Sequence, residues 1–386
     1  MTIALVYNSK EEASHSGPRS SGQPTTPSNP DSSDPVSSAR VDTAVRTLDD
    51  DYRTRVDDQY AEWDAMETIL AIKDALEKRF VVHLIRADEE AYEKLRSLQP
   101  RFVFNIAEGE YGVSREAQMP AIFEMLQLPY LGSDPLTLSI CLDKARTKEI
   151  LSYHRIATPP FAAVASMEEF DDLRVRFPSF VKPLHEGSSK GIYNTCVVRD
   201  TVALEREVRT VLERYDQPAL VEEFLSGREF TVAIMGNGIK LRVLPIVEIK
   251  FDAVPVEMNP IYSYEAKWIL DNSEDPLDIF DCPARIERDL EEKIVQLCSS
   301  AYRVLRCRDW SRIDVRLDSE GEPHILEINP LPGILPKPED NSCFPKAARA
   351  AGLSYEELIN SVVDISLERA SIPIPDVSLR TAEIRQ

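Results

Sequence analysis

Two neighbouring segments near the C-terminus place the strongest constraint on how this chain folds. They read SRIDVRLD and PHILEIN, and polar and apolar residues alternate throughout the first and over the last four residues of the second. A period of two is typical of strands, so Arg312 shares a face with Asp314, and Glu327 shares a face with Asn329. The short turn between the segments predicts that the two strands pair as an antiparallel hairpin. Four polar side chains would then meet on one face of a sheet.

Burying such polar groups costs free energy unless a ligand or partner compensates for the lost hydration. The apolar residues that alternate with them indicate that the opposite face is packed. This argues against the alternative, an exposed hairpin with a ladder of salt bridges. Carboxylate and amide oxygens are the ligands that Mg²⁺ takes while it also binds substrate phosphates. We therefore predict a metal site formed by Asp314, Glu327 and Asn329.

A glycine-rich segment, FVKPLHEGSSKG, begins in a predicted strand and suits phosphate binding. Glycine lets the backbone approach a ligand closely, and consecutive backbone N–H groups in a tight loop attract anions. Lys182 and Lys190 would add positive charge. The alternative is an ordinary hairpin turn with solubilising serines, because short glycine-rich motifs have many false positives.

The segment LVEEFLSGREF carries Glu222, Glu223 and Glu229 where a strand runs into a loop. Such a loop can offer backbone N–H and C=O groups to an adenine edge, and a carboxylate can bind ribose hydroxyls. Taken alone, the segment is better explained as an exposed acidic edge. Lys267, in YEAKWI, would by itself be a solvated surface charge.

The composition excludes some partners. The formal net charge of −21 argues against binding to nucleic acid or to an anionic membrane, which both favour basic surfaces. The six cysteines are scattered without a CxxC pair, which favours free thiols in a reducing cytoplasm. The N-terminus does not resemble a signal peptide, and no stretch approaches the length of a membrane span. We expect a cytoplasmic protein with small-molecule substrates.

The first third of the chain has the order strand, helix, strand, helix, strand, which predicts a parallel α/β unit. The expected strands are 2–8, 81–85 and 101–107, and the expected helices are 63–80 and 88–98. Residues 10–58 are rich in Ser, Pro, Thr and acidic residues, which predicts a disordered insertion. Further along we expect one helix at about 141–153, strands that include 240–249, and an amphipathic helix near the C-terminus.

Six motifs occur together in one order: LDKARTK, FVKPLHEGSSKG, LVEEFLSGREFTV, YEAKW, RIDVRLD and LEINPLPG. Over about residues 100–370 the chain resembles the ATP-grasp superfamily and, within it, the D-alanine–D-alanine ligases. The resemblance implies an α/β (α+β) ATP-grasp fold, with an N-terminal parallel α/β domain, a small central α+β domain and a C-terminal α+β domain with an antiparallel sheet. ATP would bind between the last two. The expected units are 1–133, 134–220, 221–370 and a polar tail at 371–386.

The resemblance also implies residue roles. Two Mg²⁺ or Mn²⁺ ions would take Asp314, Glu327 and Asn329 as ligands. Arg312 and the backbone N–H of Gly333 would stabilise the acyl phosphate and the tetrahedral intermediate, while Ser342 would hold the carboxylate of the second substrate. Ser188 and Lys267 would also act in catalysis. Residues expected to contact ATP are Lys144, Lys182, Ser188, Ser189, Gly191, Glu222, Phe224, Leu225, Glu229 and Lys267.

The implied reaction has two steps. A carboxylate attacks the γ-phosphate of ATP to give an acyl phosphate, and an amine then displaces phosphate through a tetrahedral intermediate. Metal ions and lysines neutralise the transferring group, so positioning dominates catalysis. The resemblance further suggests a homodimer.

Three departures from the family pattern lie on the side of the first substrate. The first strand runs into the Ser/Pro-rich insertion instead of a glycine-rich turn with Glu and Ser. Glu108 replaces a histidine, and Trp268 replaces a tyrosine. Glu108, together with Glu110, Glu62 or Asp64, could hold an ammonium or another cationic group. The alternatives are therefore dipeptide synthesis from D-alanine, ligation of a different acid in a specialised pathway, or a catalytically silent nucleotide-binding protein. Residues 10–58 could serve as a lid or as a partner-binding arm.

Overall fold

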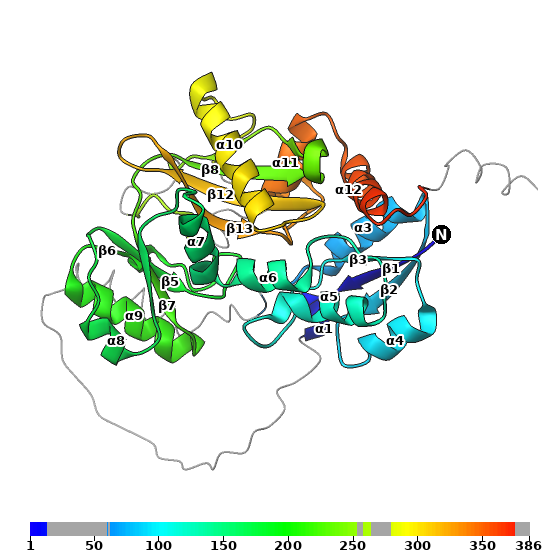
Figure 1. Cartoon of the computed structure of the whole chain (residues 1–386), viewed down its shortest axis with the longest axis horizontal. Helices are drawn as coiled ribbons and strands as arrows, with labels where there is room; N and C mark the ends of the chain where they lie inside the picture. Colours follow the sequence, from blue (N-terminus) through cyan, green and yellow to red (C-terminus); the bar gives the residue numbers. More distant parts are fainter. Residues whose placement is uncertain (14–59, 61, 253–257, 264–278, 375–386) are drawn as a thin grey trace, which may run out of the picture.

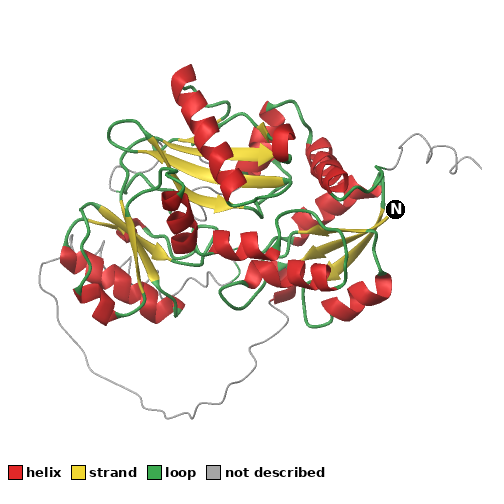
Figure 2. Cartoon of the chain, in the orientation of Figure 1, coloured by secondary structure: helices red, strands yellow, loops and turns green. Residues whose placement is uncertain are grey.

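The computed structural model describes residues 1–13, 60, 62–252, 258–263 and 279–374. Three sheets organise this part of the chain (Figures 1 and 2). A parallel sheet contains the N-terminal strand, and two largely antiparallel sheets lie further along the chain. Helices cover the outer faces of the sheets, as the red ribbons in Figure 2 show.

The N-terminal sheet has three parallel strands in the order β2-β1-β3, which confirms the predicted parallel α/β unit. Its strands are β1 (Thr2–Tyr7), β2 (Val81–Arg86) and β3 (Phe102–Asn105). Apolar side chains on its two faces enter two separate cores. One core takes up α3 (Met66–Glu77) and α12 (Tyr355–Arg369), and the other takes up α4 (Ala91–Leu98) and α5 (Arg115–Met125).

The second sheet has the order β4-β7-β5-β6, and all its neighbouring strands are antiparallel. Its strands are β4 (Phe161–Val164), β5 (Ser179–Pro183), β6 (Val197–Val198) and β7 (Ala219–Glu223). A core of its own joins this sheet to α8 (Met167–Asp171) and α9 (Thr201–Tyr215). These helices lie on the side away from the third sheet (Figure 1).

The third sheet has the order β11-β10-β8-β12-β13, and β9 also pairs with β8. Its strands are β8 (Glu229–Met235), β9 (Arg242–Val243), β10 (Val247–Ile249), β11 (Phe280–Asp281), β12 (Trp310–Leu317) and β13 (Pro323–Asn329). One face packs on α10 (Arg288–Val304) and on α7 (Lys144–Tyr153). The helix α6 (Pro135–Leu142) adds Cys141 to this core, whereas α11 (Cys343–Ala350) packs on the opposite face of the sheet, against Ala233, Met235 and Trp310. Both antiparallel sheets agree with the expected ATP-grasp arrangement.

Several sequence-based boundaries were wrong. The first long helix begins at Met66, so that Trp63 lies in the turn before it. The helix expected at 141–153 is two helices, since Asp143 is extended and caps the second one through a bond from the backbone N–H of Arg146. The strand expected over 240–249 is split into β9 and β10 around a segment that contains Pro245, which has no N–H for a ladder.

The expected insertion at 10–58 lies mostly outside the described residues. Its first residues form the short helix α1 (Lys10–Ala13). Glu11, in this helix, accepts the backbone N–H of Met66 at 3.1 Å. The start of the segment is therefore attached to the beginning of α3.

The last helix fastens the N-terminal unit to the third sheet. Arg79, just after the end of α3, donates two hydrogen bonds to the carboxylate of Asp364 in α12, at 2.7 and 3.1 Å. Arg369, also in α12, binds the fully buried Asp309, which in turn accepts the backbone N–H of Gly132 at 2.8 Å. Because these contacts join segments far apart in the sequence, they fix one wall of the cavity described below relative to the other.

Candidate active site

A cavity of about 510 Å³ lies where the three sheets meet. Its sheet wall is formed by side chains of β5, β7, β8, β12 and β13 and of the loops after them. Its N-terminal wall is formed by Lys10, Glu62, Trp63, Asp64 and Glu108. The predicted site residues that line the cavity are Glu108, Lys182, Ser188, Ser189, Glu222, Phe224, Leu225, Glu229, Arg312, Asp314, Glu327, Asn329, Gly333 and Ser342. Lys144 and Gly191 are not among its lining residues, and Lys267 and Trp268 lie outside the described residues.

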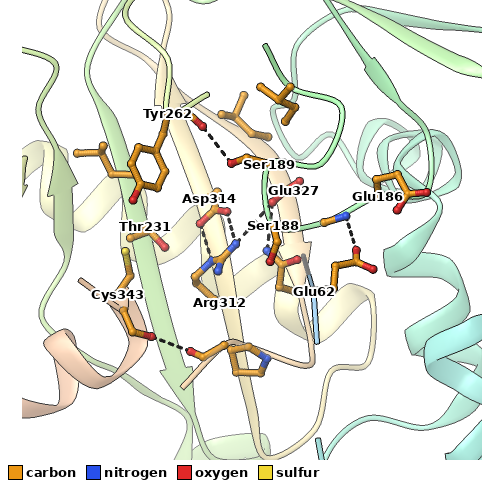
Figure 3. A pocket seen from close by; sticks show the side chains of 18 of the residues that line it. Glu62, Glu186, Ser188, Ser189, Thr231, Tyr262, Arg312, Asp314, Glu327 and Cys343 are labelled. Carbon is orange, nitrogen blue, oxygen red and sulfur yellow. Dashed lines mark hydrogen bonds and ion pairs between the residues drawn. The ribbon is translucent and has the colours of Figure 1, made fainter. Parts of the chain in front are cut away.

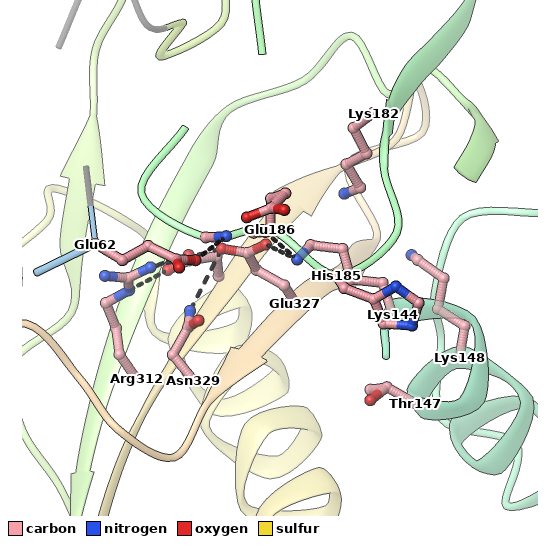
Figure 4. Close-up of polar contacts among 12 residues, drawn as sticks. Glu62, Lys144, Thr147, Lys148, Lys182, His185, Glu186, Arg312, Glu327 and Asn329 are labelled. Atoms are coloured by element: carbon pink, nitrogen blue, oxygen red, sulfur yellow. Dashed lines mark hydrogen bonds and ion pairs between the residues drawn. The ribbon is translucent and has the colours of Figure 1, made fainter. Parts of the chain in front are cut away.

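The antiparallel hairpin of β12 and β13 forms as predicted, but it contains a β-bulge where the register shifts between Asp314 and Val315. Arg312 lies opposite Asn329 and Asp314 lies opposite Glu327 in the antiparallel register. All four side chains gather on one sheet face, while apolar residues between them are buried on the other. Arg312 donates to Asp314 at 2.9 and 3.0 Å and lies 3.6 Å from Glu327 (Figures 3 and 4). The polar face therefore already contains a cation between two carboxylates.

The donor set fits a divalent cation that shares its coordination with a substrate. Burial raises the pKa of Asp314, although Arg312 opposes this. Burial also disfavours ionisation of Glu327, but the ammonium groups of Lys144 and Lys182 lower the pKa of Glu327 to about 2. Within the described residues, no three His, Cys, Asp or Glu side chains are grouped to hold a metal ion by themselves. A metal ion on this face would therefore use Asn329 and substrate oxygens in addition to the two carboxylates.

A buried lysine pair lies next to this hairpin. Lys148 and Lys182 each approach the carboxylate of Glu222 to 2.8 Å, and all three side chains are at most 5 % exposed. Burial lowers the pKa of Lys148 to about 8 even though Glu222 counteracts it. Sequence analysis did not assign a role to Lys148. Its position four residues after Lys144, on the same helix face, was the available signal.

The loop after β5 is folded to present backbone N–H groups. Ser188 and Ser189 have φ values of +49° and +60°, a left-handed conformation that is uncommon outside glycine. Such turns of successive N–H groups form anion-binding concavities. The hydroxyl of Ser189 donates to the carbonyl of Tyr262 at 3.0 Å, and Lys144 donates to the carbonyl of Glu186 at 2.5 Å. The loop is thus held from both sides.

Gly191 has a structural reason to be glycine. Its φ is +73°, and a Cβ atom there would lie 2.4 Å from the side chain of Pro183. Gly187 is also close to a neighbour, because its Cβ would meet the carboxylate of Glu62 at 2.7 Å. The two glycines therefore allow the loop to pack tightly against β5 on one side and against the N-terminal wall on the other.

An apolar patch with a charged edge lies further along the sheet wall. Phe180 and Phe224 stack with ring centroids 6.5 Å apart, and the Arg316 guanidinium lies 4.8 Å from the Phe224 ring. Glu229 accepts a hydrogen bond from Arg316 at 2.8 Å. Leu225 completes this part of the lining.

The turn after β13 is held by Ser342. Its hydroxyl donates to the carbonyl of Gly333 at 3.2 Å and accepts the backbone N–H of Leu335 at 3.2 Å. A Cβ atom on Gly333 would meet no described atom within 4 Å, so the space beside this backbone is open. The serine thus supports the turn that lies next to the polar face of the hairpin.

The N-terminal wall is attached to the glycine-rich loop by a buried ion-pair network. Arg115, at the start of α5, donates to Glu62 at 2.7 and 2.9 Å and to Glu186 at 3.1 Å. Glu62 also accepts the backbone N–H of Gly187 at 2.5 Å. Lys190 lies 3.0 Å from Glu186. Glu62 was predicted only as one of several residues that could hold a cationic group. Arg115 and Glu186 were not predicted, because the ion pairs among these three residues join distant segments.

These features define a class of protein. Two antiparallel sheets face a cavity that carries buried lysines, an anion-binding loop and a pair of carboxylates, which is the arrangement of an ATP-grasp enzyme. No helix in the described part of the chain is long and apolar enough to span a membrane.

Comparison with known proteins defines the family. The model of the "D-ala D-ala ligase C-terminus" family matches residues 151–364. The D-alanine–D-alanine ligase of Bordetella petrii is 33 % identical over 283 residues, which are 73 % of this chain and 80 % of the relative. An uncharacterised protein of Sinorhizobium fredii, y4sG, is 38 % identical over 268 residues, 69 % of this chain and 75 % of the relative.

A solved structure agrees with the fold. The D-alanine–D-alanine ligase of Bacillus anthracis complexed with ATP has a TM-score of 0.60 and 21 % identity, and the match covers 95 % of this chain and 98 % of that one. The chain belongs to the D-alanine–D-alanine ligase family, and it is an ATP-dependent ligase that forms C–N bonds.

Proposed function

We propose that this ligase joins the carboxylate of one amino acid to the amine of a second, through an acyl phosphate, with release of ADP and phosphate. The observation that carries the proposal is the polar face of the β12–β13 hairpin. It combines Arg312, Asp314, Glu327 and Asn329 in register on one wall of the cavity. The relatives named D-alanine–D-alanine ligase make D-alanine the first substrate to test.

The sheet wall supplies the ATP site in this proposal. The Phe180–Phe224 patch and Leu225 suit a planar base, and Glu229 at its edge suits ribose hydroxyls. Lys182 and Lys144 place ammonium groups near the phosphates, while Glu222 keeps Lys182 and Lys148 charged and in position. The backbone N–H groups of Ser188, Ser189 and Gly191 belong to the loop that closes over the phosphates. Lys267, outside the described residues, is proposed to reach the γ-phosphate.

Asp314, Glu327 and Asn329 are proposed to hold Mg²⁺, with Mn²⁺ as a substitute. Bound there, the cation would neutralise phosphate charge and orient the γ-phosphoryl group. The protein's own contribution is to hold the three oxygen-bearing side chains on paired strands, with the opposite strand face packed. We expect two ions, because the phosphate oxygens of the substrate can complete the coordination that these three protein side chains begin.

The second step needs a stabilised oxyanion at the acyl carbon. Arg312 is fixed by Asp314 and points into the same cavity, and the open side of the Gly333 backbone is available to the same oxygen. Donors that are already oriented do not have to reorganise as charge develops, which is why they lower the barrier. Ser342, beside this turn, is proposed to bind the carboxylate of the amine substrate.

The remaining expectations are proposals of the same kind. We propose 1–133, 134–220 and 221–370 as the three structural units, followed by the polar tail, and amino acids or related carboxylates as the substrates. We propose that the enzyme acts in the cytoplasm as a homodimer, which sedimentation velocity would test. The dimer would be rejected by a single monomer species at micromolar concentration.

The decisive test is amino-acid-dependent release of phosphate from ATP. D-Alanine, and then a panel of D- and L-amino acids, is supplied with ATP and Mg²⁺, and the product is identified by mass spectrometry. We expect a dipeptide and stoichiometric ADP, with no turnover when Mg²⁺ is removed by a chelator. Tight ATP binding without any amino-acid-dependent turnover would contradict the proposal and favour a catalytically silent nucleotide-binding protein.

A second candidate differs only in the acid. The N-terminal wall, where the first substrate is expected, carries Glu108 together with Asp64. This favours ligation of an acid other than D-alanine over loss of catalysis, because the sheet wall keeps its full set of charged side chains. In the same screen, this candidate predicts weak turnover of D-alanine and strong turnover of another acid.

A further inference from the structure

The N-terminal wall and the network behind it contain more carboxyl groups than cationic side chains. Five carboxylates and three cationic side chains belong to it. The carboxylates are Glu62, Asp64, Glu108, Glu116 and Glu186, and the cations are Lys10, Arg115 and Lys190.

Two of the cations are already committed to two of the carboxylates. Arg115 is only 8 % exposed and divides its guanidinium between Glu62 and Glu186. Lys190 binds Glu186 as well, at 3.0 Å. The backbone N–H of Gly187 and the amide of Gln217 complete the hydrogen bonding of these carboxylates. This part of the network is therefore satisfied without a ligand.

The carboxyl group of Glu108 differs from the paired carboxylates of Glu62 and Glu186. No described residue donates a hydrogen bond to its carboxylate or lies within ion-pair distance of it, although it lines the cavity. Burial and the nearby carboxylates of Glu116, Glu62 and Asp64 raise its pKa well above the ordinary value. A partly buried carboxyl group without a protein partner gains most from a cation that enters the cavity.

Asp64 and Trp63 extend the same surface. Burial raises the pKa of Asp64 to about 7 despite the proximity of Lys10, and both side chains line the cavity. Trp63 lines it as well, and its orientation is fixed because the indole N–H donates to the carbonyl of Gly109 at 3.0 Å. Trp63 is only 6 % exposed, so it forms a fixed border of the space that an ammonium or guanidinium group would enter.

We propose that the acid substrate carries a cationic side chain, an ammonium or guanidinium group additional to its α-ammonium, and that Glu108 and Asp64 bind this group beside Trp63. The inference rests on the proposed function, since it names the class of acid that the same cavity activates. The α-ammonium of the acid can still contact Glu62, but the Glu62 carboxylate remains paired with Arg115. The side-chain cation would favour the ionised forms of these two carboxyl groups, Glu108 and Asp64.

The test measures activation of the acid alone. Hydroxylamine replaces the amine substrate and attacks the acyl phosphate, so that the hydroxamate and phosphate form without knowledge of the second substrate. Two pairs of acids isolate the charge: arginine against citrulline, and lysine against norleucine, each as both enantiomers. We expect the cationic member of at least one pair to have a kcat/KM at least about tenfold higher than its neutral partner.

Two variants assign the preference to residues. Glu108→Gln keeps the shape and removes the charge, and it is expected to reduce the ratio of kcat/KM for cationic over neutral acid by about tenfold, mainly through KM of the cationic acid. Asp64→Asn is expected to reduce the ratio by a smaller factor. Glu110→Gln is the matched control, because Glu110 is exposed, does not line the cavity and should leave the ratio unchanged. Equal or higher melting temperatures of the two site variants would exclude misfolding as the cause.

The outcomes distinguish a failure of this inference from a failure of the proposed function. Equal kcat/KM values within both pairs, with D-alanine activated normally, would overturn the inference and leave the proposed ligase intact. A preference for the cationic acid that survives in both Glu108→Gln and Asp64→Asn would overturn the assignment to this wall. Absence of hydroxamate with every acid would overturn the proposed function and, with it, the inference.

Discussion

The two walls of the cavity are charged in different ways. On the sheet wall and the helix behind it, five cations and four carboxylates form ion pairs with one another. They are Lys144, Lys148, Lys182, Arg312, Arg316, Glu222, Glu229, Asp314 and Glu327. The N-terminal wall, with the network behind it, has three cations against five carboxylates.

This difference separates chemistry from specificity. A preorganised set of paired charges is what phosphoryl transfer requires, whatever acid is activated. An excess of carboxyl groups on the opposite wall, in contrast, favours their protonated forms until a cation binds there. Changes in the sheet wall should therefore lower turnover of every acid, whereas changes in the N-terminal wall should alter the choice of acid or the docking of the loop.

The largest effect is expected for Asn329→Ala. Asn329 lies on the polar face of β13 and donates to Glu327 at 3.4 Å, so the change removes one proposed oxygen ligand of the metal ion and leaves the strand pairing in place. We expect kcat/KM to fall by about 10³-fold for every acid, which corresponds to about 4 kcal/mol. His324→Ala, on the same strand but outside the cavity, is the control. A loss that depends on the acid would break the comparison between the walls.

The next largest effect is on stability, in Glu222→Gln. The change leaves Lys148 and Lys182 buried without their shared carboxylate, and removal of one partner of a buried ion pair costs about 3–4 kcal/mol. Urea denaturation would measure the loss. Glu223→Gln, the neighbour in the sequence, is only half-buried and should change the free energy of unfolding by no more than about 0.5 kcal/mol. Equal stability of both variants would show that the lysine pair is not held by Glu222.

Arg115→Met tests the link between the walls. It leaves Glu62 and Glu186 without their shared guanidinium, so we expect a loss of about 3 kcal/mol in stability and a rise in KM for ATP, because the glycine-rich loop loses its attachment. Arg115→Lys, which keeps the charge, should recover part of both. Arg96→Met, an exposed arginine of α4 paired with Glu93, is the control and should have almost no effect. A rise in KM for the acid alone would place Arg115 in the acid site instead.

Much of the sheet wall could be predicted from the sequence, because its residues alternate along two strands joined by a short turn. A period of two fixes which side chains of one strand share a face, so Arg312 could be grouped with Asp314, and Glu327 with Asn329. A register counted from the turn would set Asp314 opposite Leu326, and the β-bulge at this point, which was not predicted, sets it opposite Glu327 and brings the two groups together. The parallel order of the N-terminal strands followed in the same way from the alternation of strands and helices.

The N-terminal wall could not be predicted to the same extent. Glu62, Arg115 and Glu186 come from three segments without a shared period, and only the packing of the N-terminal unit against the glycine-rich loop brings them together. Trp63 fitted the helical period, but the helix begins three residues later and the ring faces the cavity instead. Ion pairs between distant segments produce no periodic pattern in the sequence, whereas a strand produces an alternation of polar and apolar residues.

The smallest predicted effect is a pH dependence of stability that originates behind the N-terminal wall. Burial, reinforced by the Glu62 carboxylate, raises the pKa of Glu116 to about 8, although Arg115 and Lys144 oppose the shift. In the unfolded chain this group ionises near pH 4.5, so unfolding between the two values releases a proton, and stability falls as pH rises from about 4.5 to about 8.

Glu116→Gln removes this contribution. The variant and the unaltered protein should have similar free energies of unfolding at pH 5, and the variant should be more stable by about 2 kcal/mol at pH 8.5. Urea denaturation at both pH values measures the difference. A matched substitution on the sheet wall, Glu222→Gln, removes a carboxyl group whose pKa Lys148 and Lys182 keep low against the effect of burial, and it should destabilise the protein at pH 8.5. A gain in stability at pH 8.5 for Glu116→Gln and a loss for the sheet-wall variant would support the contrast between the two walls. Changes of the same sign in both variants would contradict it.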